Sequence, residues 1–459
     1  MTNMKKNYIY LAASLLLAGC AQDAFEESNL QETDVPQEIK LSVGTRGIEV
    51  SGRGVGSVGA GEYEDQWNGE KLTIYAFKKT DQPFQSENDE DIYLKGVTAL
   101  TAAYNSSSTD PNYDNSTSGL TFESGSKFYP LQGAYNFVGY YTDDATLGTP
   151  TYNNTTMSIP VKINGTQDLM IADAKLNYSN KALLVQSLIK AGKLGNSTTD
   201  SEINYIDNNG NPIDPNHQTV ITNEYNKAYS SYTARRGVQP SMVFEHQLVR
   251  LNFFVKAGDE YTMAHSDGTK KLGVYISNIE IGSRTDGNII IQNDGEISFE
   301  PQGTTETGLL VRPAKFDGTI NSTGTLESDP VGDEYEIPSD FSQNVANQVG
   351  KGIMVMLPTR TDDTTNGTNR YYLANITATQ LFDKDGNPIP DNQKTKVYQN
   401  IKIQKPQIDG GVVEFEAGKS YDITITVYSN QSINITATLT GWEDGGDVEI
   451  NPEDNEFQI

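Results

Sequence analysis

Hydrophobic residues in this chain recur mostly at every second position, which is the spacing of a β-strand with one buried face. Alternating segments include residues 39–43, 72–76, 249–253, 423–427 and 433–439. Antiparallel sheets with one covered and one wet face produce this pattern. A helical spacing of leucines is clearest between Lys181 and Lys193. The sequence therefore predicts an all-β fold with one or two short helices.

The length of 459 residues exceeds that of one ordinary domain. A polar region rich in Tyr and Asn gives way to a new strand at Met242, which predicts a domain boundary near Arg236–Ser241. Each half then has a usual size for a β-sandwich with long loops. We expect one sandwich domain over residues 47–240 and a second over residues 241–459.

The N-terminus has the features of a secretion signal. Lys5 and Lys6 precede an apolar run that ends in Leu17-Ala18-Gly19-Cys20. The run has about half of the roughly 20 residues that a membrane-spanning helix needs. Residues 1–19 are therefore predicted to be a cleaved lipoprotein signal peptide, with Cys20 as the lipidated residue. The alternative is a buried core cysteine behind a short helix.

The composition argues against several classes of function. The chain has 34 Lys and Arg against 61 Asp and Glu, for a net charge of −27, whereas nucleic-acid affinity comes largely from basic residues. A single cysteine excludes a disulfide framework within the monomer and zinc sites built from several cysteines. His217, His246 and His265 are too far apart in the sequence to form a close ligand pair. We expect no nucleic acid, no metal and no cofactor.

Two loops share one pattern. Residues 207–213 (DNNGNPI) resemble residues 383–389 (DKDGNPI). The spaced carboxylates suggest calcium, but an EF-hand loop requires Gly at its sixth position and a closing Glu, and here Gly is fourth. A turn of the Asn/Asp-Gly kind explains both copies more simply.

Several segments, taken in order, resemble the fimbrillin (type V pilin) family of Bacteroidales. They are the lipoprotein signal, Thr45-Arg46-Gly47 after an alternating strand, Phe128-Tyr129-Pro130, Tyr135–Tyr141, Gln167–Met170, Phe244–Leu251, and the closing strands before Gly441-Trp442. Taken in this order, the segments cover nearly the whole chain. The resemblance implies two transthyretin-like antiparallel β-sandwich domains in a subunit of a surface pilus. His246 is expected to be a domain-core or interface residue rather than a ligand, and Trp442 and the tyrosines are expected to be packing residues.

A processing mechanism follows from the first strand. Ile39, Leu41 and Val43 would bury one face of a displaceable strand within a propeptide of residues 20–46. A trypsin-like protease needs a basic side chain in exposed, flexible backbone, and Arg46-Gly47 lies within residues 44–61, which have seven glycines in eighteen residues. Arg53-Gly54 is a second candidate in this tract, and a third interpretation is that Arg46 is only a charged loop residue. The resemblance implies cleavage by an arginine-specific surface protease.

Once the propeptide is cut, a strand from another subunit could replace it, which would build a head-to-tail fibre. The candidate donor residues alternate in the C-terminal tail: Val448, Ile450, Phe457 and Ile459. The partners would be other pilin subunits, and host ligands for an adhesive fibre. A subunit at the fibre tip needs no donor, so stalk and tip positions both stay open. The chain would lie in the outer membrane by its lipid anchor and then in an extracellular fimbrium.

Two other functions are left open. One is a non-polymerising surface lipoprotein, or a tip adhesin, that binds glycans or host proteins, with Tyr152, Tyr178 or Tyr232 stacking on sugars. The other is a glycosidase, which needs two carboxylates about 5–10 Å apart. No catalytic sequence motif marks such a pair. We therefore expect a protein that is not an enzyme.

Overall fold

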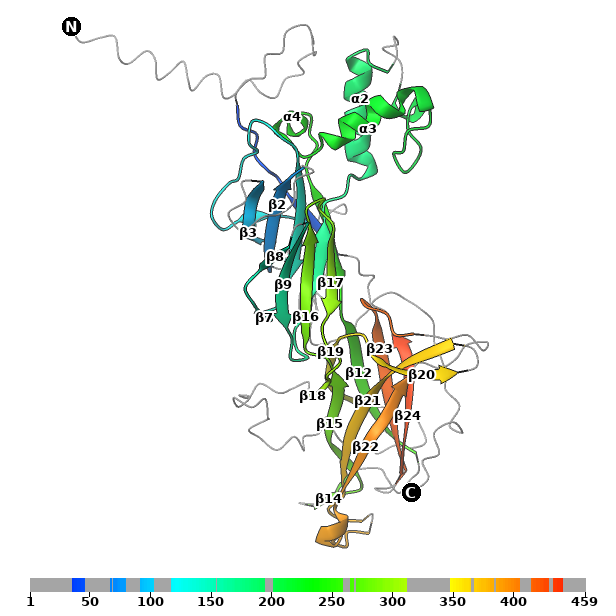
Figure 1. The fold of residues 1–459 in the computed structure, drawn as a ribbon. Coiled ribbons are helices and arrows are strands. Elements are labelled where there is room, and N and C mark those ends of the chain that lie inside the picture. The colour runs from blue at the N-terminus through cyan, green and yellow to red at the C-terminus, as the bar shows by residue number, and fades with distance from the viewer. Residues whose placement is uncertain are drawn as a thin grey trace, which may run out of the picture. The chain divides into compact units, whose positions relative to one another are not determined.

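The computed structural model describes residues 35–45, 67, 69–79, 91–102, 117–153, 155–194, 201–258, 265–267, 270–311, 347–364, 367–383, 385–404, 414–428 and 432–440. They form several sheets and three α-helices (Figure 1), so the predicted all-β fold is confirmed, with three short helices where one or two were expected. The chain forms two compact units. The helical unit has the described residues 35–37, 129–132 and 177–238, and the β unit has the others.

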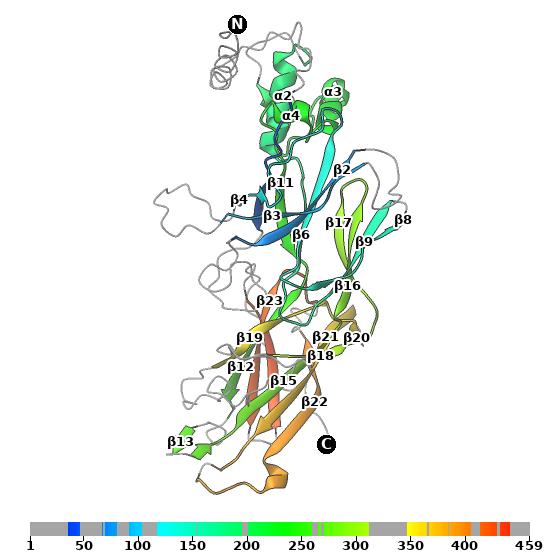
Figure 2. The same cartoon turned by 90° about the vertical axis from the view of Figure 1, so that its left-hand side faces the viewer.

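The largest sheet of the β unit has eight strands (Figure 2 labels several of them). In spatial order these are β4 (Thr117–Gly119), β1 (Ser42–Thr45), β11 (Ser241–His246), β10 (Met170–Asp173), β6 (Tyr135–Tyr141), β2 (Lys71–Lys78), β3 (Ile92–Leu100) and β5 (Thr121–Phe122). The outermost strands, β4 and β5, are separated in sequence only by Leu120. One continuous segment therefore pairs with β1 at one end of the sheet and with β3 at the other, which closes the sheet on itself.

A second sheet covers the eight-stranded one. Its strands are β17 (Ile297–Pro301), β16 (Asp286–Gln292), β9 (Thr156–Lys162) and β7 (Thr146–Leu147), with β8 (Thr151–Asn153) also on β9. Tyr75 and Phe77 of β2 join the core between these two sheets, whereas Leu72 and Ile74 are buried on the other face of β2. We expected the alternating strands to expose one face to solvent. This expectation is wrong for β2, because buried side chains also fill the interior of the closed sheet.

The later strands form a second pair of packed sheets. One consists of β19 (Asn347–Val355), β12 (Val249–Ala257), β23 (Ser420–Tyr428) and β24 (Ser432–Thr440). The other consists of β18 (Thr307–Leu310), β15 (Tyr275–Ser283), β21 (Gly367–Thr379) and β20 (Arg360–Thr364), with β22 (Thr395–Gln404) on β21. Their core includes Phe253, Ile279, Ile376 and Ile423. A short hairpin pairs β13 (His265–Asp267) with β14 (Lys270–Leu272).

Most neighbouring strands are antiparallel, but β1 runs parallel to β11 and β12 runs parallel to β23. Strands from the two sides of the expected domain boundary also pair with each other. Strand β11 lies in a sheet with β1, and β16 pairs with β9. The division at residues 240 and 241 into two sandwich domains stays a prediction.

The helical unit contains α2 (Tyr178–Lys190), α3 (Pro215–Asn226) and α4 (Ser231–Ala234), with a 3₁₀ turn at Glu202–Asn204. A second 3₁₀ turn, Asp391–Gln393, lies in the β unit. Helix α2 starts three residues earlier than the leucine spacing indicates, because Asn177 caps it by accepting a hydrogen bond from the backbone amide of Asn180. Among the described residues, no helix is both long and apolar enough to cross a membrane.

Candidate functional site

Residues 38–45, here called the closing segment, bury the three side chains that the alternation picks out. Ile39, Leu41 and Val43 have exposed fractions of 4%, 3% and 0%. Lys40 between them is exposed and Ser42 is half-buried. The segment thus places one apolar face in the interior of the eight-stranded sheet, which is the arrangement that an exchangeable strand requires.

The backbone of the closing segment is hydrogen-bonded on both sides. On one side, the amide of Ile39 donates to the carbonyl of Lys127 at 2.8 Å, and the amide of Leu120 donates to the carbonyl of Leu41 at 2.9 Å. On the other side, the amide of Ser42 donates to the carbonyl of Pro240 at 3.2 Å. Strand β1 then continues between β4 and β11.

Gln239 ties the segment to the start of β11. The backbone amide of Lys40 donates to Gln239 Oε1 at 3.2 Å, and Gln239 Nε2 donates to the carbonyl of Glu38 at 3.4 Å. All of these partners are distant in sequence. Loss of the segment would leave their backbone groups unpaired along a sheet edge, which is unfavourable unless another strand or water replaces it.

The interior beside β1 is closely packed. Val43 is the register partner of Met242, and both are fully buried. The ring of Trp67 meets Phe244 edge-on at 5.4 Å between centroids. A Cβ atom at Gly139 would lie 2.8 Å from Ile74 Cδ1, 3.1 Å from Phe244 Cζ and 3.3 Å from the backbone oxygen of Thr73, so a side chain there would force its neighbours to shift. A replacement strand must fit a cavity of defined shape.

Burial of Ile39, Leu41 and Val43 contributes about 5–9 kcal/mol before chain entropy is subtracted. This figure is an upper estimate, because an unfolded chain already covers part of its apolar surface. At this free energy the segment does not leave its site readily.

The other residues of the predicted processing pathway lie outside the described residues. These are the lipidation site Cys20, the cleavage site Arg46-Gly47, and the candidate donor residues Val448, Ile450, Phe457 and Ile459. Strand β1 ends at Thr45, one residue before Arg46. The displacement of β1, the cleavage and the donor role all stay predictions.

His246 is a core residue, as expected, and it has a partner that the sequence did not indicate. Its Nδ1 lies 2.8 Å from Asp168 Oδ2, and both side chains are buried. The backbone amide of Asp168 donates to Asp143 at 3.3 Å, and burial raises the pKa of the Asp143 carboxyl. This pair fixes the end of β11 against the segment before β10, which is a structural role.

The two similar loops form the same turn. Asp207 Oδ1 accepts hydrogen bonds from the backbone amides of Asn209 and Asn211, at 2.8 Å each. Asp383 accepts the equivalent two bonds at 3.0 and 2.8 Å. The glycine of each copy has a positive φ, 74° and 80°. The aspartates are thus engaged by their own loops, and a turn explains both copies.

The tyrosines considered for sugar stacking have different surroundings. Tyr152 packs against the core of the β unit. Tyr178 is the first residue of α2 and is 37% exposed. The ring of Tyr232 is covered on one face by the Arg236 guanidinium, at 3.7 Å from the ring centroid. Tyr152 belongs to the β unit, whereas Tyr178 and Tyr232 belong to the helical unit.

No family model matches the sequence, and no curated protein matches it. Among solved structures, a candidate cell adhesion protein of Bacteroides uniformis is similar, with 14% identity, 89% of this chain and 99% of that chain covered, and a TM-score of 0.38. The fimbrial anchor protein Mfa2 of Porphyromonas gingivalis is 9% identical, with 89% of this chain and 98% of that chain covered and a TM-score of 0.29. The tip fimbrial protein Mfa3 of the same organism is 9% identical, with 88% of this chain and 100% of that chain covered and a TM-score of 0.29.

These neighbours are adhesion and fimbrial proteins, the class of protein that the sequence resemblance names. Their identities and TM-scores are low, so the function must rest on the residues of the chain itself. The closing segment is the feature that bears on it most directly.

Proposed function

We propose that this chain is a structural subunit of a cell-surface pilus, exported as a lipoprotein and assembled by exchange of the closing segment. The observation that supports the proposal is the burial of Ile39, Leu41 and Val43 in the closing segment, whose strand β1 precedes every other described strand in sequence. Removal of this strand from the N-terminal end interrupts no other strand. An internal strand could not leave in this way.

Cleavage after Arg46 turns an intramolecular strand into a separate peptide. Before the cut, the closing segment rebinds at the high effective concentration of a tethered chain. After the cut, only the hydrogen bonds and apolar contacts described above retain it. A second subunit that offers a strand with the same two-residue apolar spacing can then replace it.

The C-terminal tail is our candidate donor. Val448 and Ile450 have the same two-residue spacing as Leu41 and Val43. Each subunit would give a strand to one neighbour and accept a strand from another, so the contact is head-to-tail and the assembly grows as a filament. In this proposal a lipid on Cys20 retains the unprocessed subunit at the outer membrane, and an arginine-specific protease releases it.

The test uses two arginines of the same glycine-rich tract. Arg46→Ala should leave residues 20–46 on the surface protein and prevent polymer formation, whereas the matched Arg53→Ala should be processed as wild type. N-terminal sequencing of surface-sheared material and laddering on partly denaturing gels measure both outcomes. Unchanged processing and unchanged ladders in Arg46→Ala would refute cleavage at this site. A processed chain that never forms ladders would favour a non-polymerising surface adhesin.

A further inference from the structure

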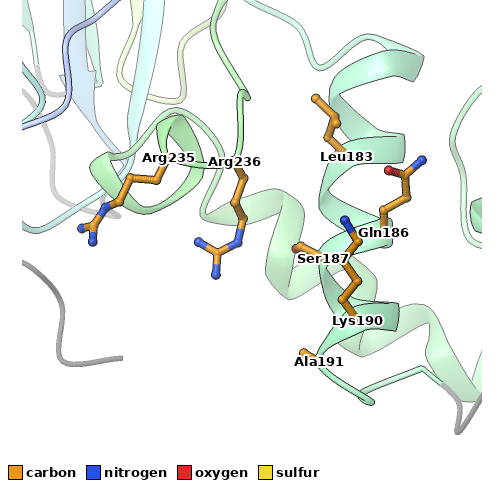
Figure 3. Close-up of a pocket in the computed structure, with 7 residues that line it drawn as sticks. All are labelled: Leu183, Gln186, Ser187, Lys190, Ala191, Arg235 and Arg236. Atoms are coloured by element: carbon orange, nitrogen blue, oxygen red, sulfur yellow. The ribbon is translucent and has the colours of Figure 1, made fainter. Parts of the chain in front are cut away.

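The helical unit contains a pocket that pilus assembly does not use. It lies between one face of α2 and the turn after α4 (Figure 3), has a volume of about 230 Å³, and is lined by Leu183, Gln186, Ser187, Lys190, Ala191, Arg235 and Arg236. Three of these seven side chains are cationic, in a chain whose net charge is −27. A local positive cluster on so acidic a protein favours an anionic ligand there over other parts of the surface.

Arg236 is fixed in place before any ligand arrives. One of its terminal nitrogens donates to the backbone carbonyl of Tyr232 at 2.9 Å, and its guanidinium stacks on the Tyr232 ring. Among the described residues it has no carboxylate partner. Because a guanidinium has five N–H donors, most of them remain available for a carboxylate or sulfate oxygen pair.

Lys190 supplies the second positive charge from the opposite wall. In Figure 3 its side chain rises along α2 toward Gln186 and Ser187, while Arg236 extends into the gap on the other side. No ion-pair partner of Lys190 is found within the described part of the chain. Lys190 is also the last residue of α2, where a cation stabilises the helix end, so its role must be tested by binding as well as by stability.

The remaining lining suits a small polar ring. The Ser187 hydroxyl donates to the backbone carbonyl of Leu184 at 2.8 Å, so its oxygen is left to accept a hydrogen bond from a ligand. Gln186 donates its amide to Glu202 at 3.1 Å, which leaves its carbonyl oxygen as an acceptor. Leu183, 38% exposed, and Ala191 add an apolar wall. The volume lies below the roughly 300–1,000 Å³ of pockets for drug-sized ligands, so it fits one ring with its substituents.

We infer that this pocket binds an acidic sugar residue, that is, a single sugar ring that carries a carboxylate or a sulfate. Arg236 and Lys190 would bind the anionic group from two sides. Ser187 and Gln186 would contact ring hydroxyls, and the Leu183 wall would pack against the C–H face of the ring. This inference concerns the helical unit alone and does not depend on strand exchange.

The experiment titrates the intact chain with glucuronic acid, glucose 6-sulfate, glucose and inorganic sulfate, with saturation-transfer NMR as the readout. We expect at least one acidic sugar to bind at least tenfold more tightly than glucose and than inorganic sulfate. The affinity should fall as salt is raised, because the contact is ionic. Absence of saturable binding by both acidic sugars would overturn the inference. Equal binding of inorganic sulfate would also overturn it, because the pocket would then be an anion site without sugar recognition.

The variants separate the pocket from general charge effects. Arg236→Ala and Lys190→Ala should each weaken the acidic sugar at least tenfold, and Arg236→Lys should lie between Arg236→Ala and wild type, because it keeps the charge but loses the planar fork. Lys181→Ala removes one positive charge from the same helix outside the lining and should bind normally. Thermal unfolding of each variant shows that it is folded. Equal losses in Lys181→Ala and Arg236→Ala would contradict a specific site.

Discussion

The two parallel strand pairs of the β unit differ in how the rest of the chain retains them. Strand β1 pairs with β11 over four residues and is the first described strand, with the predicted cleavage site directly after it. Strand β23 pairs with β12 over eight residues and continues into the antiparallel partner β24. Both strands place their apolar side chains in a core, so burial alone does not distinguish them.

The difference lies in covalent connection. In the proposed mechanism, a cut at Arg46 lets β1 leave without breaking any other strand, whereas β23 is joined to fold elements on both sides and would leave only when its sheet unfolds. Two strands of similar burial can therefore be exchangeable or permanent, according to their place in the chain.

Paired truncations test this difference with the largest expected effect. Leu41→Ala and Ile423→Ala each remove a fully buried side chain and should lower the free energy of unfolding by about 2–5 kcal/mol. In protein cut after Arg46, Leu41→Ala should speed release of the N-terminal peptide at least about thirtyfold, since 1.4 kcal/mol is a factor of ten. Ile423→Ala should leave that rate unchanged. Mass spectrometry measures the rate at which the N-terminal peptide is released. Equal release rates in the two variants would contradict the difference between β1 and β23.

Gly139 tests whether the interior beside β1 has a fixed shape. Gly139→Ala would push a methyl group against Ile74 and Phe244 and should lower the free energy of unfolding by about 1–3 kcal/mol. The matched Gly119→Ala, on β4, meets nothing within 4 Å and should be nearly neutral. Urea denaturation measures both. If Gly139→Ala left the free energy of unfolding unchanged, the side chains of the interior would be able to rearrange. A replacement strand would then need no close fit.

The repeated turns give a comparison in which no difference is expected. Asp207→Ala and Asp383→Ala each leave two backbone amides without their acceptor, and each should lower the free energy of unfolding only slightly, because water can replace the lost acceptor in these exposed loops. Thermal unfolding of both variants measures the cost. A much larger loss in one copy would show that its loop has a role beyond the turn.

The free energy of unfolding should also depend weakly on pH, through a lysine beside the eight-stranded sheet. Burial lowers the pKa of Lys79, directly after β2, to about 8. In the unfolded chain this lysine keeps its proton to a higher pH, so the free energy of unfolding should rise between pH 8 and 9.5, by about 1 kcal/mol. Lys79→Met should abolish the rise. A stability that falls over this range in wild type and variant alike would contradict the assignment.

Part of this arrangement could be predicted from the sequence. The alternation at residues 39–43 identified the buried face of the closing segment, and the leucine spacing located α2. Helix α3 was missed because its residues are mostly polar, although Asp214-Pro215 is an N-cap followed by proline, a common start of a helix. Closure of the sheet through β4 and β5 was not predictable, because strands of three and two residues carry no hydrophobic period.

The pairing of β1 with β11 was also beyond the sequence, since the partners are about 200 residues apart and run parallel. The same holds for the Arg236 and Lys190 pocket, whose walls are α2 and the turn after α4. In these cases tertiary structure brings together residues that no local pattern links.

A reversible lock on β1 tests the central claim most directly. Val43 and Met242 are register partners on neighbouring strands, so Val43→Cys with Met242→Cys should form a disulfide between them, in a background that carries Cys20→Ser. After cleavage at Arg46, the oxidised protein should stay monomeric and should form polymers once a reductant opens the bond, whereas Val43→Cys alone should polymerise in either condition. Polymers that form while the disulfide is intact would contradict strand exchange at this position.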